Sequence, residues 1–463
     1  MEKVHRLYKK KILEDPFTNL FKTELYSLRY LKKNDKIIVS ASGGLDSTVL
    51  LLLLHSINIH KILVAHVDHA IRKDSIQDKI FVESLCMELK IQFFSLTLNP
   101  DSKPKKDSPE QWAREKRYEY LKNLSIETRS DWIMTGHHSN DNAETILMNL
   151  SRRAGVNGLS GIPQKNGKII RPLLSYEKKV LCDFVDRVGL PFKNDYTNSD
   201  ISIPRNFIRR KVLKPWHSKI PSLIKAIYKS TQYFYNWKQS LDHLLIKFII
   251  SKLPISDDRI EIPLNLINDL PNLVKVRLIQ LLFDQEKKLW SKHDLKMLEQ
   301  FLKKVSVGKT FNLINKWSLL HDRGLIIAKK NTIIDSKHET YIRPNKIVFF
   351  YNMMYQIIIN ENHAELSNSK NQELVDWSKF KNKELKIRIW NEGDVFQPLG
   401  MKNKKKISDF LINEKIDSFS KKTQSVLTVD GEIAWVCGLR ISEWAKITKH
   451  TKQKALLTFT PVR

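Results

Sequence analysis

Cysteine is scarce in this sequence of 463 residues, which contains three, at Cys86, Cys182 and Cys437. They lie too far apart to form a Cys-x-x-Cys pair, so the sequence offers no zinc ribbon, redox motif or disulfide framework. Such sparing use of cysteine is typical of the reducing cytosol, and we expect a cytoplasmic protein.

Long apolar runs are also absent. Of the two most apolar stretches, 49–54 is too short to span a bilayer and 347–359 is interrupted by polar residues. The first twenty residues carry acidic as well as basic side chains and lack the apolar core of a signal peptide. We therefore expect no membrane segment and no membrane partner.

Acidic residues are fewer than basic ones. The sequence has 50 Asp and Glu against 79 Lys and Arg, which gives a net charge of +29. This excess favours a polyanionic partner, either nucleic acid or an acidic membrane surface. A proteome rich in Lys and Asn would produce the same excess without a partner. With 41% hydrophobic and 28% charged residues the chain has an ordinary globular composition, and its length suggests about three domains.

The first part of the chain alternates between two kinds of apolar pattern. Short apolar runs predict strands at 36–40, 61–67, 92–98 and 132–135. Helical spacing or N-terminal capping signals predict helices at 75–90, 108–124 and 141–150. This order predicts an α/β domain with a parallel, doubly wound sheet covered on both faces.

Composition shifts divide the chain into three expected domains. We expect a nucleotide-binding α/β domain over 1–216, a mostly helical and basic middle domain over 217–380, and a small α+β domain over 385–463. In the last domain, Asp430-Gly431 between apolar runs predicts a hairpin. In the middle domain, basic residues alternate with aromatic ones over 228–237, which suits RNA binding, although such spacing more often marks a helix core.

A glycine-rich loop follows the first expected strand and opens a helix; it reads Ser42-Gly43-Gly44-Leu45-Asp46-Ser47. Its glycines let backbone N–H groups approach an anion, its serines can donate hydrogen bonds, and the helix N-terminus adds positive potential. Asp46 would repel a phosphate unless a cation lay between them, which implies Mg²⁺. The lysine of a Walker A loop is missing, and a simple capped Gly-Gly turn is the alternative.

This loop resembles the pyrophosphate loop of the N-type ATP pyrophosphatases, which cut ATP between its α and β phosphates. Five further segments, in this order and spacing, resemble the bacterial tRNA(Ile)-lysidine synthetases through roughly the first half of the chain. The stretch 389–448 resembles the C-terminal domain of that family. The five segments are 64–69 (VAHVDH), 113–118 (AREKRY), 136–145 (GHHSNDNAET), 171–174 (RPLL) and 205–209 (RNFIR).

The resemblance implies a specific two-step activity on the isoleucine tRNA whose anticodon is CAU. The C2 oxygen of the wobble cytidine attacks the α-phosphate of ATP, and the ε-amine of free L-lysine then displaces AMP to give lysidine. The modified tRNA decodes AUA rather than AUG. The implied partners are ATP, Mg²⁺, lysine and this tRNA, with the oligomeric state left open and a homodimer among the alternatives.

Two carboxylates and a histidine follow the fourth expected strand. Asp141 and Glu144 share a helix face by their i,i+3 spacing, next to His137. Together they would attract a cationic amino acid and could take the proton that a lysine ε-amine must lose before it attacks. The alternative is an acidic first helical turn favoured by the helix dipole.

Basic and imidazole side chains complete the expected site. Arg114 and Arg205 are candidate clamps for the α-phosphate or the cytidine, with Arg209 less certain, because arginine matches phosphate geometry in bidentate fashion. His66 ends the second strand and is expected to contact the nucleotide. The pair His66 and His69 could instead bind zinc, but no further ligand motif supports this.

Two positions depart from the family pattern. Asn140 stands where the family often has the first of two aspartates, and Arg153 stands where a glycine is usual.

Two rival functions are considered. A tRNA thiolase on the same fold would commonly use cysteine near the crevice, and the three cysteines here are more simply packing residues. A non-catalytic RNA-binding protein would leave the loop and Asp141 unexplained.

Overall fold

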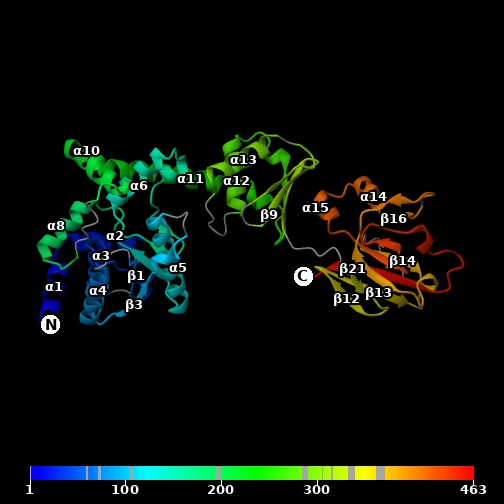
Figure 1. The fold of residues 1–463 in the computed structure, drawn as a ribbon, viewed down its shortest axis with the longest axis horizontal. Helices are drawn as coiled ribbons and strands as arrows, with labels where there is room; N and C mark the ends of the chain where they lie inside the picture. The colour runs from blue at the N-terminus through cyan, green and yellow to red at the C-terminus, as the bar shows by residue number, and fades with distance from the viewer. Residues whose placement is uncertain are drawn as a thin grey trace. The chain divides into compact units, whose positions relative to one another are not determined.

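The structure is a computed structural model that describes residues 2–58, 61–70, 75–104, 108–193, 200–283, 290–304, 306–313, 316–331, 339–360 and 371–462. Its contacts divide the chain into two compact units, Met1–Leu241 and Asp242–Arg463. The division falls within the long helix α11 (Leu223–Phe248) (Figure 1). No helix in the described ranges is both long and apolar enough to cross a membrane.

The first unit contains a six-stranded sheet in the order β3-β2-β1-β4-β6-β5. All neighbouring strands run parallel except the short pair β5 and β6. The strands are β1 (Lys36–Ser40), β2 (Lys61–Asp68), β3 (Gln92–Thr97), β4 (Trp132–Thr135), β5 (Lys165–Asn166) and β6 (Ile169–Ile170). The expected parallel, doubly wound sheet is thus confirmed, with its first four strands at the expected positions.

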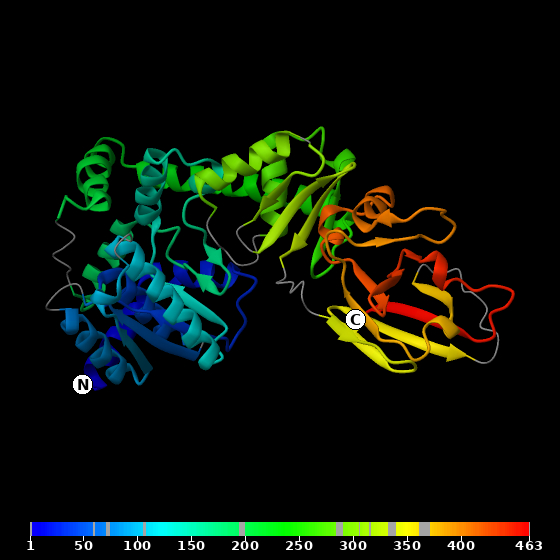
Figure 2. The ribbon, with the colours of Figure 1, turned by 45° about the vertical axis from the view of Figure 1, so that its right-hand side comes forward.

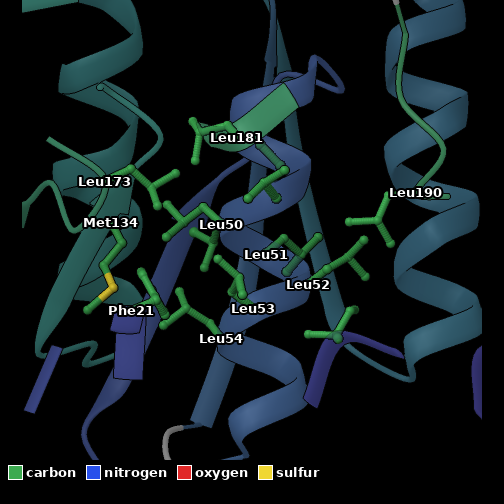
Figure 3. Packing of buried hydrophobic residues seen from close by; sticks show 14 of the residues in the cluster. Phe21, Leu50, Leu51, Leu52, Leu53, Leu54, Met134, Leu173, Leu181 and Leu190 are labelled. Carbon is green, nitrogen blue, oxygen red and sulfur yellow. The ribbon is translucent and has the colours of Figure 1, made fainter. Parts of the chain in front are cut away.

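Helices cover both faces of this sheet because successive strand residues point to opposite sides. Ile37 and Val39 of β1 pack among residues of α2, α3, α4 and α8, whereas Ile38 packs against Leu121 and Leu124 of α5. The helices are α1 (Glu2–Glu14), α2 (Pro16–Ser27), α3 (Leu45–Ile57), α4 (Ser75–Leu89), α5 (Pro109–Glu127), α6 (Ser139–Ser151), α7 (Val156–Leu159) and α8 (Lys178–Val188). Figure 3 shows Leu181 of α8 and Leu173 beside Leu50 of α3.

The chain then returns toward α6 before entering α11. α9 (Pro204–Phe207) continues into a π-helical turn, Ile208–Leu213, and α10 (Lys214–Lys219). Buried residues of this segment and of α11 pack on Ala143 of α6. Asn142 of α6 donates a hydrogen bond to Thr231 of α11 at 3.0 Å, which ties the first half of α11 to this unit.

The second unit begins with a four-stranded antiparallel sheet beside two helices. The strands are β7 (Arg259–Pro263), β8 (Thr310–Asn312), β9 (Trp317–Asp322) and β10 (Leu325–Lys330), in the order β7-β10-β9-β8, and the helices are α12 (Asn272–Phe283) and α13 (Lys292–Lys303). A mostly helical reading of this region is therefore incomplete. Strand-like runs are expected only from Gly324 onward, whereas β7, β8 and β9 lie in the part that is expected to be helical.

A five-stranded sheet (β11-β15-β18-β19-β20), a four-stranded sheet (β12-β13-β21-β14) and the short pair β16 and β17, all antiparallel, complete the second unit and are best seen in yellow to red in Figure 2. β13 (Met353–Asn360) pairs along its full length with β21 (Lys454–Pro461), and β11 pairs with β15, so strands from 339 onward share sheets with strands beyond 385. The expected hairpin at Asp430-Gly431 joins β18 to β19. The remaining elements are β11 (Glu339–Tyr341), β12 (Ile347–Phe350), β14 (Gln372–Asp376), β15 (Leu385–Ile389), β16 (Val395–Phe396), β17 (Lys405–Lys406), β18 (Ser425–Val429), β19 (Glu432–Val436), β20 (Arg440–Ile441), α14 (Ile407–Asn413) and α15 (Ser418–Lys421).

Candidate functional site

The sheet of the first unit reverses its strand order between β1 and β4. From β1 the chain adds β2 and β3 on one side, and β4 then pairs with the other side of β1. Loops that follow β1 and β4 therefore meet at one point of the carboxyl edge, where open α/β sheets bind ligands. The loop 42–47 and the segment 136–141 are these two loops.

The glycine-rich loop forms a close turn that opens α3. Gly43 has a φ of +87°, a left-handed conformation that favours glycine, and Gly44 is the N-cap of α3. The hydroxyls of Ser42 and Ser47 lie 3.2 Å apart, and the Ser47 hydroxyl also donates to the carbonyl oxygen of Gly44. Backbone N–H groups, two hydroxyls and a helix N-terminus are thus gathered in one cradle, which fits a polyphosphate.

Gly136 brings the loop after β4 against this cradle. A Cβ atom at position 136 would lie 2.9 Å from the backbone C and O of Asp46 and 3.0 Å from the Ser47 nitrogen. No larger residue fits without moving the loop. Gly136 belongs to the segment 136–145, but the sequence alone predicted no role for it. Its position directly after a buried strand is the feature that could have indicated this close approach.

Asp46 lies at the start of α3 and faces two other elements. Its Oδ1 accepts a hydrogen bond from the Lys178 ammonium at 2.5 Å, and its Oδ2 lies 3.7 Å from His138 Nε2. Its side chain is 29% exposed, so one edge of the carboxylate remains open to a ligand. Lys178 and His138 were not singled out from the sequence.

Asp141 approaches the same His138 nitrogen as Asp46. Its Oδ2 is 3.6 Å from His138 Nε2 and accepts the backbone N–H of His138 at 3.0 Å. Its Oδ1 lies 3.6 Å from Arg205. Burial would raise the pKa of Asp141, but His138, His137 and Arg205 outweigh burial and lower it, so this carboxylate stays ionised.

His137 contacts β4 through its imidazole ring. Its Nδ1 lies 2.8 Å from the Thr135 hydroxyl. Burial, together with the nearby charges of Arg171, Arg117 and Arg114, lowers its pKa far below the usual histidine range despite Asp141. The structure therefore keeps His137 neutral, and it is the adjacent His138 whose Nε2 lies near both Asp46 and Asp141.

Glu144 has different surroundings from those expected for a carboxylate that meets a ligand. Its side chain is 1% exposed, and its two oxygens bond Arg205 Nε at 2.7 Å and Arg209 Nε at 2.5 Å. The two arginines come from α9 and from the π-helical turn, so Glu144 fixes that segment on α6. The expectation of a carboxylate pair open to lysine is corrected to one open carboxylate, Asp141, backed by a buried one.

Arg114 belongs to a second positive group, on α5. The guanidinium carbons of Arg114 and Arg117 lie 5.2 and 5.4 Å from the centre of the Tyr118 ring. Burial would raise the pKa of Tyr118, but the charges of Arg114, Arg117 and Arg171 prevail and lower it. These charges also act on His137, which places the group beside the crevice.

His66 and His69 lie at the end of β2. The Nδ1 of His66 bonds the Ala41 carbonyl at 2.9 Å, and its buried Nε2 has no hydrogen-bond partner among the described residues. Burial lowers the pKa of His66, and burial with the Arg117 charge lowers that of His69 to about 4. Within the described ranges no three His, Cys, Asp or Glu side chains are grouped to hold a metal.

The two departures from the family pattern are accommodated locally. The Asn140 side-chain oxygen accepts the backbone N–H of Lys178 at 2.8 Å, a bond that an aspartate oxygen could also make. Arg153 has a φ of +56°, a left-handed conformation in which glycine would carry no strain. The asparagine keeps its bond to Lys178 but carries no negative charge.

Two protein-family models match the chain. A PP-loop domain model matches residues 10–215, and a TilS substrate C-terminal domain model matches residues 385–456. Together they include the crevice described above and the strands β15 to β20 of the C-terminal sheets.

Curated relatives match almost the entire chain. A protein of Clostridium perfringens named tRNA(Ile)-lysidine synthase is 29% identical over 451 residues, covering 93% of this chain and 96% of its own. A protein of the same name from Bacteroides thetaiotaomicron is 29% identical over 445 residues, covering 92% and 97%. One from Thermosipho africanus is 37% identical over 211 residues, covering 44% and 49%.

Solved structures match parts of the chain. The U34-tRNA thiolase NcsA of Methanococcus maripaludis has a TM-score of 0.40 at 19% identity and covers 48% of this chain and 80% of its own. A crystal structure of a TilS C-terminal domain has a TM-score of 0.25 at 18% identity and covers 27% and 99%.

Proposed function

The chain belongs to the tRNA(Ile)-lysidine synthase family, and we propose from this premise that it joins free lysine to C2 of the wobble cytidine of the isoleucine tRNA with a CAU anticodon. It is an ATP-dependent ligase that forms a carbon–nitrogen bond and releases AMP and pyrophosphate. The observation that carries the proposal is the meeting of Asp46 and Asp141 at one nitrogen of His138, where the strand order of a PP-loop sheet reverses. Its place of action is the cytoplasm.

The first step requires a held triphosphate and a stabilised α-phosphate. The loop 42–47 would hold the leaving β and γ phosphates through its backbone N–H groups and serine hydroxyls. Asp46, with its open edge, fits a Mg²⁺ bound through one carboxylate and the phosphates. The C2 oxygen of cytidine attacks the α-phosphate and pyrophosphate leaves, while Arg114 and Arg205 offset the charge that develops there. His66 Nε2 is free to hydrogen-bond the nucleotide.

The second step requires a neutral amine beside the activated cytidine. Asp141 attracts and orients the lysine ammonium because it stays ionised. Its lowered pKa makes it a weak base, so the amine gives up its proton to water. The ε-nitrogen attacks C2, the bond from C2 to the AMP oxygen breaks, and AMP departs with its electron pair. Glu144 acts indirectly, because it holds Arg205 and Arg209 in place.

The tRNA is held by a larger part of the chain. We propose that residues 217–380 contact the body of the tRNA and that residues 385–463 bind it as well, with the net charge of +29 supplying phosphate contacts. On α11, Lys225, Lys229, Tyr233 and Trp237 follow one another at i,i+4 spacing and are all exposed, which supports a nucleic-acid contact there. The site residues lie in one chain, and a homodimer remains an open proposal.

The cysteines argue against sulfur transfer as the alternative. Burial raises the pKa of Cys86 and of Cys437 to about 12 and also raises that of Cys182. A sulfur relay depends on a readily formed thiolate, which none of these positions favours.

The decisive experiment is transfer of radiolabelled lysine onto a CAU-anticodon isoleucine tRNA transcript in the presence of ATP. Elongator methionine tRNA is the control, because its anticodon is the same and its body differs. Label on the isoleucine tRNA alone, with AMP and pyrophosphate released, is the expected result. ATP cleavage without transfer of label to either tRNA would refute the assignment of lysine.

A further inference from the structure

Lys178 is the least expected member of the site. It is the first residue of α8 and lies far in sequence from the loop 42–47, yet its ammonium bonds Asp46 Oδ1 at 2.5 Å. The Lys178 backbone is fixed as well, since its N–H donates to Asn140 of α6. Leu181, one turn later, packs in the same core as Leu50 of α3 (Figure 3). The lysine stem therefore starts from a rigid base and ends at the cradle.

The Lys178 ammonium supplies a positive charge, which no side chain of the loop 42–47 provides. Asp46 is the one carboxylate of the loop 42–47, and it would repel the phosphates that the backbone N–H groups attract. Mg²⁺ that arrives with the nucleotide would take the Asp46 carboxylate and release the ammonium. A lysine is a compact charge on a flexible stem, and at 36% exposure this one has room to turn from the carboxylate to a phosphate oxygen.

We propose that Lys178 is a phosphate-binding residue of this loop that serves as the counter-ion of Asp46 until the nucleotide and its Mg²⁺ arrive. The proposal rests on the proposed function, since it assumes that the loop binds ATP with Mg²⁺. It gives Lys178 two roles with opposite consequences. In the free protein it competes with metal for Asp46, and in the complex it adds to the hold on the phosphates.

The test uses Lys178→Met, which keeps the length of the stem and removes the charge. Mn²⁺ binding without nucleotide, followed by electron paramagnetic resonance, should become three- to tenfold tighter because Asp46 loses its competitor. Affinity for α,β-methylene-ATP with Mg²⁺, measured by calorimetry, should fall about tenfold. A residue with a purely structural role would weaken both measurements or change neither.

Two further variants show whether the effect depends on the positive charge and on its place at residue 178. Lys178→Arg should restore nucleotide affinity to within about threefold of the parent protein. Lys179→Met, at the exposed neighbouring position, should leave both affinities within twofold. If Lys178→Met binds the analogue as tightly as the parent, or binds free Mn²⁺ no better, the proposal is wrong. If the parent itself fails to bind the analogue, the proposed function fails first, and neither measurement depends on lysine or tRNA.

Discussion

Glu144 illustrates how a buried charge changes the meaning of a motif residue. Its carboxylate is 1% exposed and neutralised by two arginines, of which Arg205 is 25% exposed. The Glu144→Gln change keeps the size of the side chain but leaves two guanidinium groups facing a neutral amide. We expect a loss of about 3 kcal/mol in unfolding free energy, measured by denaturant titration, because removing one partner of a buried pair leaves a buried charge uncompensated.

A surface glutamate provides the control for this change. Glu119 pairs with Lys116 at 2.9 Å but is 59% exposed. Glu119→Gln should therefore cost less than about 1 kcal/mol. If Glu144→Gln proved as stable as the parent while lysine transfer was lost, Glu144 would be a direct ligand contact rather than a support for the arginines.

The histidine at the end of β2 makes the first unit sensitive to acid. The pKa of His69 in the folded protein is about 4, against 6.5 without the fold. Between these values the unfolded chain binds the proton and the folded chain does not, so stability falls as pH drops from about 6.5 toward 4. His69→Gln should reduce proton uptake on unfolding near pH 5 by about one.

The comparison of unfolding midpoints at several pH values checks this prediction. Above pH 7.5 the parent and the His69→Gln variant should differ by a constant amount, and below pH 6.5 their curves should converge. Parallel curves throughout the acid range would contradict a neutral, buried His69.

Residues within contiguous motifs were the ones that the sequence could identify. Asp46 and Asp141 each follow a strand at the carboxyl edge, and their meeting follows from the strand order. Lys178 begins a helix that brings it to Asp46 only through packing on α3, and the choice between His137 and His138 depends on side-chain direction. Local residue spacing predicts neither the contact between Lys178 and Asp46 nor the directions of the two histidine side chains.

At the scale of elements, prediction succeeded for where a strand begins and ends but not for which strand it pairs with. The strands 36–40 and 132–135 are reproduced residue for residue, because each is a short apolar run between clear loop signals. β13 and β21 pair along their full length although about a hundred residues separate them. Local pattern carries no information on such pairing, so the C-terminal sheets begin well before the expected boundary near Leu385.

The structure of α11 contradicts the interpretation of its aromatic residues as a helix core. Tyr233 is 68% and Trp237 is 75% exposed, so the helix-core interpretation is wrong for these two. With exposed lysines one and two turns earlier, they can stack on bases while the ammonium groups contact phosphates. The double change Tyr233→Ala and Trp237→Ala should weaken tRNA binding by about thirtyfold or more, measured by filter binding, because each of the two base stacks contributes roughly 1–3 kcal/mol.

Tyr26 offers a matched control for the aromatic pair. It is 51% exposed on α2, so Tyr26→Ala removes an exposed ring elsewhere on the same unit. This variant should bind tRNA within twofold of the parent. Equal affinity of the double variant and the parent would show that α11 contacts something other than the tRNA substrate.

At the scale of the whole molecule, the charge of +29 has two explanations that differ in their response to salt. Lysines that contact phosphates release counter-ions from the RNA, so the affinity for tRNA falls steeply with salt concentration. Lysines that are merely compositional remain solvated in the free and bound states and leave affinity unchanged. The salt dependence therefore separates function from composition without a mutation.

We expect a plot of log affinity against log salt concentration to have a slope of about −4 or steeper, as five or more phosphate contacts would give. The slope should be similar for isoleucine and methionine tRNAs, since phosphate contacts carry no sequence information. The affinity for α,β-methylene-ATP at constant Mg²⁺ should change much less over the same range, because its phosphates are held by fixed backbone donors at one point. A slope shallower than about −2 would assign most of the positive charge to composition.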